Sequence, residues 1–458
     1  MARQNNKRQE ADSPFSFGAA VDAPGKDEGA KRETSGAVFG SKEPVDAGPD
    51  YGYRKRRTHK HDEVSVYNEQ MDERYAMDRR LKVVVALLVA AVVLVPLTMV
   101  LPTHVLDTGS AEEALAWAGT SLGGRIKAVS EIFSGTAAGS AMAIVLWQTL
   151  AVFLAGAALA LNGAVYQGAL KNALASPSTL GVMSGGTLGT VVYTLVFTFP
   201  QLEQGQDYIL LSDAVARYAG MNVFEYIVAT QMRALCSVAG CFLVVALVLL
   251  IAHIAGRGKV SKVGLLISGQ VFSAVITSFV EMVRVYLRDN GTDAQYEAVR
   301  SIVGGGIDNV VTPLDVVLIA VPVAIGICIV MALRYRLNLL AFNDAEARSM
   351  GLSTTRTRNA VIVVCTILTA VIVSFCGSVG FVGFLVPHLV RKMVGPDFRY
   401  YIPASICMGA IYLLLAHYIM NLGGFLAGSL GTFTSLIGVV FFIVVAIRQR
   451  ARGNVDWI

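Results

Sequence analysis

Long apolar runs begin at Leu81 and recur to residue 447. Each is near the roughly 20 residues that an α-helix needs to cross the hydrocarbon layer of a bilayer. The pattern predicts an all-α, polytopic transmembrane domain over residues 81–447, and two of its last four helices can be partial. Ten spans are predicted, at residues 81–101, 147–168, 179–199, 233–255, 263–285, 313–333, 359–376, 380–395, 402–420 and 430–447.

The two ends of the chain differ from this domain. Residues 1–80 are rich in Gly, Ser and charged residues, which bury too little apolar surface to offset chain entropy, so a disordered cytosolic tail is expected. Its basic cluster, Arg54–Arg57, either contacts anionic membrane lipid or belongs to a solvated linker. No apolar run lies near the start, where a secretory signal peptide would need one. Residues 448–458 are expected to form a short cytosolic tail.

The charges of the loops indicate an orientation. Only 16% of the residues are charged, against roughly 25% in an average soluble protein. Lys and Arg favour the cytosolic side of short loops. With the N-terminus inside, the loops after the first span place 15 basic and 4 acidic residues inside, against 7 basic and 14 acidic outside. Both termini are therefore predicted to be cytosolic, and the modest net charge of +5 does not indicate a nucleic-acid partner.

The sequence offers no catalytic or metal-binding pattern. All six cysteines lie in apolar runs, so neither a disulfide framework nor a metal site is expected. No His, Asp and Glu cluster has ligand spacing, and no Ser, His and Asp trio stands out. No catalytic residue, metal or cofactor is assigned to this chain, and a membrane enzyme is the least favoured function.

The second span carries small residues on one helical face. Gly156 and Gly163 lie seven residues apart, a spacing that lets two helix backbones approach closely in lipid. Asn162 and Gln167 lie near this seam, and polar groups at membrane depth face the bundle interior or a pathway. They either border a translocation pathway or make hydrogen bonds between helices.

The longest predicted cytosolic loop, residues 334–358, contains a sequence typical of a short capped helix. A polar residue can cap its start, and a glycine suited to the left-handed conformation can end it. Such a helix between two spans either receives force from a partner or is a plain amphipathic connector. The residues assigned to it are Asn343, Asp344, Glu346, Ala347, Arg348 and Gly351.

An apolar run with Gly and Pro at residues 377–395 predicts tight packing and a bent or interrupted helix. His388 and Arg391 lie three residues apart near its cytosolic end, and a structural role is expected for this His. The residues assigned to helix packing, here and in the second and last spans, are Gly156, Gly163, Gly380, Gly383, Pro387, His388, Arg391, Gly431 and Gly438.

Five segments in order resemble the FecCD family of ABC-transporter permeases, the type II importer subunits for iron–siderophore complexes, haem or vitamin B12. The resemblance covers roughly residues 144–447. The matching segments are Gly156–Gln167, Asn172–Gly181, Asp344–Gly351, Gly380–Arg391 and Gly431–Gly438.

This resemblance implies a bacterial cytoplasmic-membrane permease with ten spans per subunit. It implies a dimer of two copies or two related chains, an extracytoplasmic substrate-binding protein, and two cytosolic ATPase subunits that bind ATP and Mg. It also implies that the loop at residues 337–352 couples to the ATPase and that the pathway follows the dimer axis. The chain has no Walker motif, so ATP hydrolysis is expected in a separate subunit.

Some positions depart from the family pattern. Val145–Gln148 stand where the family usually has Arg-x-Pro-Arg, whose arginines grip acidic residues of the binding protein. His417 and Asn421 stand where the family tends to have Asp and Arg. Both are candidate pathway residues, together with Asn162 and Gln167.

Two transport functions fit these observations. The first is the permease subunit of an ATP-driven importer, with iron–siderophore complexes as the expected cargo and haem or cobalamin as alternatives. The second is a secondary transporter driven by an ion gradient, which usually needs ionisable groups at membrane depth. Few such groups lie mid-span, and His417 is the main exception, so the first function is favoured.

Overall fold

The computed structural model describes residues 54–101, 122–134, 137–198, 223–255, 262–307, 310, 312–422 and 429–451. Two units are distinguished, Met1–Tyr67 and Asn68–Ile458, and all described side chains belong to the second. Residues 1–53 of the predicted N-terminal tail and 452–458 of the C-terminal tail lie outside the described residues.

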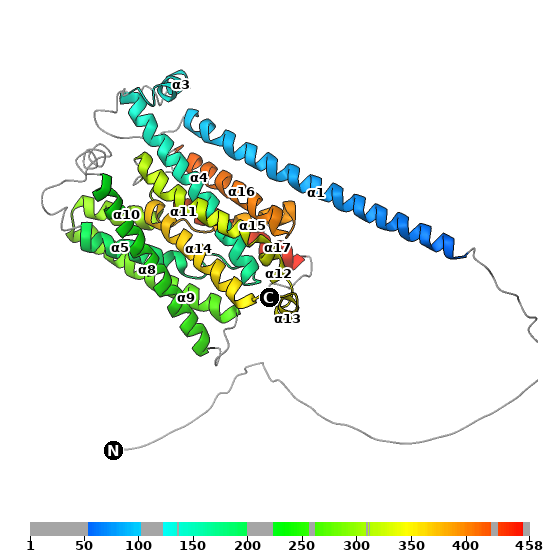
Figure 1. Cartoon of the computed structure of the whole chain (residues 1–458). Helices are drawn as coiled ribbons and strands as arrows, with labels where there is room; N and C mark the ends of the chain where they lie inside the picture. Colours follow the sequence, from blue (N-terminus) through cyan, green and yellow to red (C-terminus); the bar gives the residue numbers. More distant parts are fainter. Residues whose placement is uncertain are drawn as a thin grey trace, which may run out of the picture. The chain divides into compact units, whose positions relative to one another are not determined.

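Every regular element in the described ranges is a helix, which confirms the all-α prediction (Figure 1). The helices are α1 (Arg54–Val100), α3 (Leu122–Ser130), α4 (Ala137–Ala169), α5 (Val182–Tyr193) with a π-helical turn at Thr194–Thr198, α8 (Val223–Ala255), α9 (Lys262–Asn290), α10 (Asp293–Gly304), α11 (Pro313–Ala332), α12 (Arg334–Leu340), α13 (Asp344–Ser349), α14 (Thr354–Cys376), α15 (Val382–Val394), α16 (Phe398–Met420) and α17 (Leu430–Ala451).

Seven of the described helices are long and apolar enough to cross a membrane, and two apolar helices are shorter. α15 has 13 residues, and at 1.5 Å per residue it is about 20 Å long, too short for a hydrocarbon core of about 30 Å. Each of the ten predicted ranges contains a helix, but ten full crossings remain a prediction. The seven long segments are Met77–Val100, Met142–Ala169, Ile227–Ile254, Gly264–Asn290, Pro313–Ala332, Thr354–Cys376 and Phe398–Met420.

The start of α1 corrects the predicted extent of the N-terminal tail. Residues 54–80, predicted as part of a disordered segment, are helical and continuous with the first span. They contain neither Gly nor Pro and are rich in Arg, Lys, Glu and Met, which are strong helix formers. The helix therefore continues through them although they lack apolar periodicity.

α4 is the central helix of the bundle and packs against α11, α14, α15 and α16. Its small residues let neighbouring backbones meet. A Cβ atom on Gly156 would overlap the carbonyl oxygen of Gly409 in α16, and one on Gly163 would overlap that of Gly383 in α15. Only glycine fits at contacts of this kind, so these positions fix how closely α15 and α16 approach α4.

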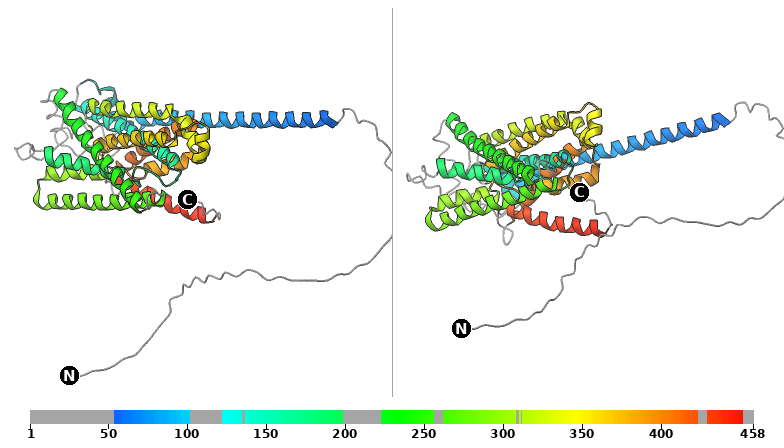
Figure 2. Two further views of the ribbon diagram at one scale, coloured as in Figure 1. Left: turned by 60° about the horizontal axis from the view of Figure 1, so that its bottom comes forward. Right: turned by 90° about the horizontal axis from the view of Figure 1, so that it is seen from below.

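A second group of helices is built around α5, which packs against α8, α9 and α14. Here too glycines make the close contacts, since a Cβ on Gly240 of α8 would overlap the carbonyl oxygen of Gly185 in α5. Figure 2 shows α8 and α9, both green, as neighbours in this group. The two groups meet where α14 packs against both α4 and α5.

Candidate functional site

The predicted short helix of the long loop is present as α13. Its first turn is stabilised by a capping interaction, in which the backbone N–H of Asn343 donates to Glu346 Oε2 at 3.3 Å. Gly351 follows with a φ of 84°, and its N–H donates to the Arg348 carbonyl at 2.9 Å. A left-handed glycine therefore ends the element as the sequence predicts.

Asp344 joins this helix to two others. Lys171, just after α4, donates to Asp344 Oδ1 at 2.9 Å and to the Phe342 carbonyl at 2.6 Å. Arg358 of α14 donates to the same carboxylate at 3.2 Å and to the Ala169 carbonyl, at the end of α4, at 2.9 Å. The hydrogen bond from Lys171 and the charge of Arg358 lower the pKa of the Asp344 carboxyl. A single carboxylate thus ties α13 to α4 and α14.

α12 is fixed in a similar way to α16. Asn338 donates to Asp397 Oδ1 at 2.8 Å and accepts from the backbone N–H of Phe398 at 2.9 Å. Asp397 is the cap of α16 and accepts from the backbone N–H of Arg399 at 3.0 Å. Both short helices are therefore anchored to long ones by hydrogen bonds rather than by the connecting chain alone.

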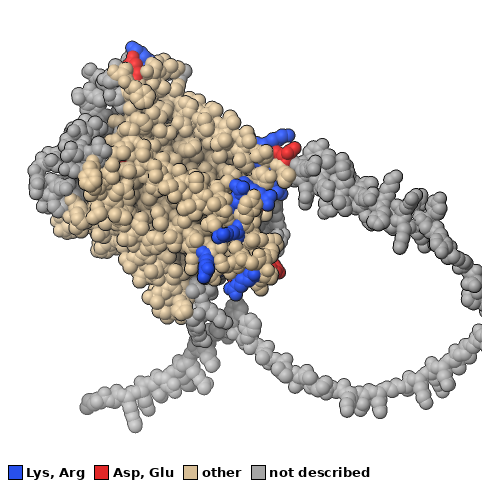
Figure 3. All heavy atoms as spheres, in the orientation of Figure 1, with Lys and Arg blue, Asp and Glu red and all other residues tan. Residues whose placement is uncertain are grey.

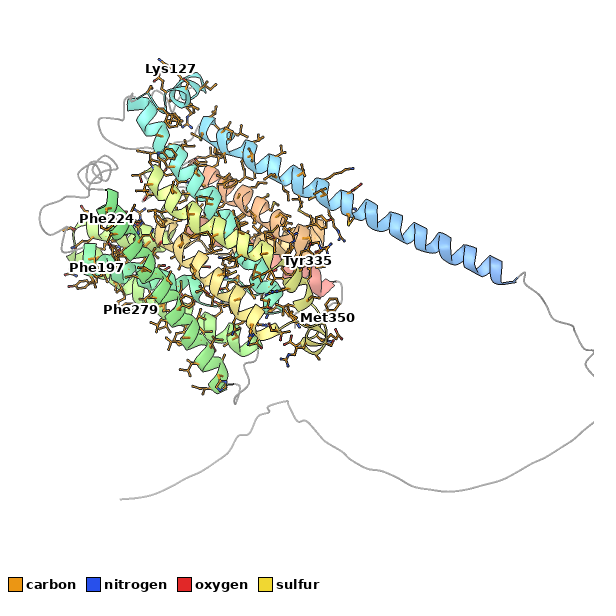
Figure 4. All side chains as sticks on the ribbon, viewed as in Figure 1. Lys127, Phe197, Phe224, Phe279, Tyr335 and Met350 are labelled. Carbon is orange, nitrogen blue, oxygen red and sulfur yellow. The ribbon has the colours of Figure 1, made fainter. Side chains whose placement is uncertain are left out.

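The outer side of α12 and α13 is exposed and carries charged residues as well as large apolar and aromatic ones. Ala347 is fully buried, whereas Glu346 and Arg348 are exposed, and Arg348 Nε donates to Thr354 Oγ1 of α14 at 3.4 Å. Figure 4 shows Tyr335 and Met350 at this end of the molecule, where their side chains are 51% and 49% exposed. On the face drawn in Figure 3, Lys and Arg gather at the same end, and the described helix sides between the two ends are free of charge.

Asn162 and Gln167 lie in the interior of the bundle. Asn162 is fully buried and donates to the Cys365 carbonyl at 3.1 Å and to Thr369 Oγ1 at 3.0 Å, both in α14. Gln167 is 2% exposed; it accepts from the Tyr401 hydroxyl at 3.2 Å and donates to the Phe384 carbonyl at 3.4 Å. Of the two alternatives from the sequence, these contacts fit hydrogen bonds between helices.

The polar residues at the end of α16 pair with each other. His417 Nε2 and Asn421 Nδ2 lie 3.1 Å apart, one turn from each other. The two side chains are therefore joined within one helix.

Residues assigned to packing in α15 and α17 lie in tight contacts. His388 lies between the rings of Phe384 and Phe441, with centroids 6.4 and 5.9 Å away, and the guanidinium of Arg391 lies over the ring of Tyr401 at 5.4 Å. Pro387 is buried within α15. The glycines border other segments closely: Gly380 faces Ser435, Gly431 faces the Ser378 carbonyl, and Gly438 lies under the ring of Phe381.

A cavity of about 750 Å³ lies between α5, α9, the end of α10, the start of α15 and α17. Phe381, just before α15, and Phe384 of α15 form part of its wall, and Phe442 does so from α17. Its polar lining consists of hydroxyl groups and one amide. These polar residues are Ser178, Thr179, Ser184, Thr187, Gln270, Ser273, Thr277, Ser378, Thr432 and Ser435.

The predicted pathway residues do not line this cavity. Asn162, Gln167, His417 and Asn421 are all absent from its wall, and their assignment to a translocation pathway stays a prediction. The hydroxyl groups that do form the wall were not predicted from the sequence. Their signal was a set of Ser and Thr residues at helical spacing inside apolar runs, which sequence alone does not separate from ordinary helix-bonded hydroxyls.

Comparison with known proteins identifies the family. The FecCD transport family matches residues 114–448. The chain belongs to this family. One FecCD relative is the vitamin B12 import system permease protein BtuC of Salmonella paratyphi A, 31% identical over 313 residues, or 66% of this chain and 84% of that protein. Another is the iron(3+)-hydroxamate import system permease protein FhuB of Bacillus subtilis, 28% identical over 307 residues, or 67% of this chain and 70% of that protein.

A solved structure has the same fold. It is described as an inward-facing conformation of a metal-chelate type ABC transporter, and it aligns with a TM-score of 0.56 at 21% identity, covering 80% of this chain and 99% of that one. The family match over residues 114–448 confirms the family resemblance predicted from the five motifs. The protein is a multi-pass membrane permease of the ABC type, a family whose ATPase is a separate subunit.

Proposed function

We propose that the chain is the membrane subunit of an ATP-driven importer for metal chelates, with iron–siderophore complexes as the first candidate cargo and haem or cobalamin as the alternatives. The observation that carries this proposal is the anchored α12–α13 element, which joins an exposed surface to the central helix α4 through Asp344 and Lys171. Named relatives import vitamin B12, iron(3+)-hydroxamate and Fe(3+)-citrate.

The proposed partners follow from this role. Two cytosolic ATPase subunits, which bind ATP and Mg, seat on α13, where exposed Glu346, Arg348 and Met350 are available for contact. A second permease copy or a related chain completes the pathway, and an extracytoplasmic binding protein delivers the cargo. Both termini are cytosolic in this proposal, because that orientation places most loop Lys and Arg inside. Epitope tags at the two ends should then be accessible from the same side.

The binding protein has to dock without the family's arginines. Val145 and Leu146 of α4, in the segment that replaces Arg-x-Pro-Arg, pack against a small apolar cluster with Met99 and Met142. The predicted outer loops are acidic, with 14 acidic and 7 basic residues. A binding protein with a basic docking surface is therefore proposed, and its affinity should fall as salt rises.

The coupling role is tested by proline substitution in α13. The Ala347 N–H donates to the Asn343 carbonyl at 2.8 Å, so Ala347→Pro removes a helical hydrogen bond and should abolish ATP-driven uptake while membrane insertion persists. Ala345→Pro is the matched control, because first-turn N–H groups have no helical partner. Replacement of Glu346 and Arg348 by Ala tests the exposed contacts. Unchanged uptake by Ala347→Pro with a co-expressed ATPase would contradict the coupling role.

Uptake by vesicles that lack an ATPase distinguishes an ATP-driven importer from the alternative, a gradient-driven transporter. Vesicles that contain the purified chain without an ATPase should show no uptake of radiolabelled iron chelate under a proton or sodium gradient. Uptake under these conditions would overturn the proposed function.

A further inference from the structure

The wall of the cavity between α5, α9, α15 and α17 carries no formal charge. None of the described residues that line it is Asp, Glu, Lys, Arg or His. Its volume of about 750 Å³ lies within the range of about 300–1,000 Å³ typical of sites for drug-sized molecules. The space is therefore suited to a bulky solute.

α9 presents two different faces, and only one borders the cavity. Gln270, Ser273 and Thr277 follow each other at spacings of three and four residues and line the cavity. Leu266, Ile276 and Val280 of α9 also line it, whereas Ile267, Val271 and Val275 do not and are more than half exposed. Polar groups at membrane depth face cavities and pathways, while apolar groups face lipid. The three polar side chains that α9 contributes to the wall therefore favour contact with water or cargo in the cavity.

The hydroxyl groups of the wall are largely paired within the protein. Ser184 donates to the Gly181 carbonyl at 2.9 Å, Thr187 to the Met183 carbonyl at 3.1 Å, and Ser435 to the Gly431 carbonyl at 2.7 Å. The hydrogens of these three hydroxyl groups are engaged in hydrogen bonds, so their oxygens offer weakly polar acceptors to the cavity. Such a wall can exchange contacts with a polar, uncharged surface, but it cannot balance a net charge that has left water.

We propose that this cavity selects electrically neutral metal chelates, whose own ligand atoms cancel the charge of the metal and present amide, hydroxyl and apolar groups to the wall. This inference rests on the proposed function and narrows its cargo. A free metal ion would find no carboxylate, imidazole or thiolate among the described lining residues, so it would have to arrive enclosed. A multiply anionic chelate would lose its hydration without gaining a counter-charge.

The test uses the sign of an introduced charge. Gln270→Glu and Gln270→Lys place a negative or a positive charge on the exposed cavity side of α9, and Gln270→Met, which removes the amide without adding charge, is the reference. Uptake is measured in a strain lacking the native gene, with its ATPase and binding protein present, and membrane yield is measured for each variant. The probes are radiolabelled iron as a neutral trihydroxamate, radiolabelled iron citrate, labelled haem and labelled cyanocobalamin.

If the cargo is neutral, a negative and a positive charge at position 270 should lower uptake to a similar degree. Wild type should carry the trihydroxamate or cyanocobalamin, and Glu and Lys at position 270 should both lower uptake about threefold to tenfold below the Met variant, because each charge loses water when the cargo passes. Opposite effects of Glu and Lys, or equal uptake by all three variants, would overturn the inference while leaving an ATP-driven importer in place. Absence of ATP-dependent uptake of every probe by wild type would remove the proposed function and this inference together.

Discussion

The close contact between α4 and α15 predicts that Gly163→Ala destabilises the protein. A Cβ on Gly163 would overlap the carbonyl oxygen of Gly383 and lie 2.5 Å from its Cα. The obstacle is backbone, which cannot rotate away as a side chain can, so the two helices have to separate. Overpacking costs about 1–3 kcal/mol, and the upper half of that range is expected here. The higher helix propensity of alanine stabilises the helix by up to about 1 kcal/mol, so the net loss in free energy of unfolding is about 1–2 kcal/mol.

The assay is thermal unfolding of the purified protein in detergent, at one scan rate because unfolding of membrane proteins is often irreversible. A loss of this size lowers Tm by about 2–4 °C for each kcal/mol in a chain of 150–250 residues, and by less in a longer chain. Gly123→Ala in α3 is the control, because a Cβ there meets nothing within 4 Å, so Tm should stay the same or rise slightly. Equal Tm values for Gly163→Ala and wild type would refute the packing explanation.

Two further predictions concern polar contacts. Because its partners lower the pKa of the Asp344 carboxyl, its pairing contributes stability above the ordinary Asp pKa of about 3.9 and loses it only below that pH. Asp344→Asn should therefore cost at most about 1 kcal/mol at pH 7, since this side chain is 42% exposed, and should flatten the acid-side loss in a Tm–pH profile. Tyr401→Phe leaves the buried Gln167 carbonyl without its donor and should cost about 1–3 kcal/mol in the same assay, against little change for half-buried Tyr400→Phe.

The helices were predictable from the sequence for a physical reason, whereas the family was recognised from its five motifs. In lipid, the backbone must satisfy its own hydrogen bonds, so apolar runs of span length become helices whatever their neighbours are. The ends of α13 were also predictable, because the cap at Asn343 and the left-handed Gly351 act within one turn of chain. Both kinds of signal are local.

The cavity wall and the roles of the buried amides depended on tertiary packing. The sequence marks Asn162 and Gln167 as polar residues in a span, but the direction in which they face is set by α14, α15 and α16, which lie far away in the chain. The start of α1 was missed for the opposite reason, since residues 54–80 have helix-forming composition without apolar periodicity. Apolar periodicity detects amphipathic helices, and a helix predicted only by its composition escapes it.

The single carboxylate that receives both Lys171 and Arg358 has a mechanical consequence. Lys171 directly follows α4, the helix at the centre of the bundle, and Arg358 belongs to α14, the helix that bridges its two halves. A push on α13 is therefore delivered to the middle of the protein rather than to its periphery. If α13 is displaced in the proposed importer, α4 and α14 should move together with it, so that its displacement reaches both groups of helices.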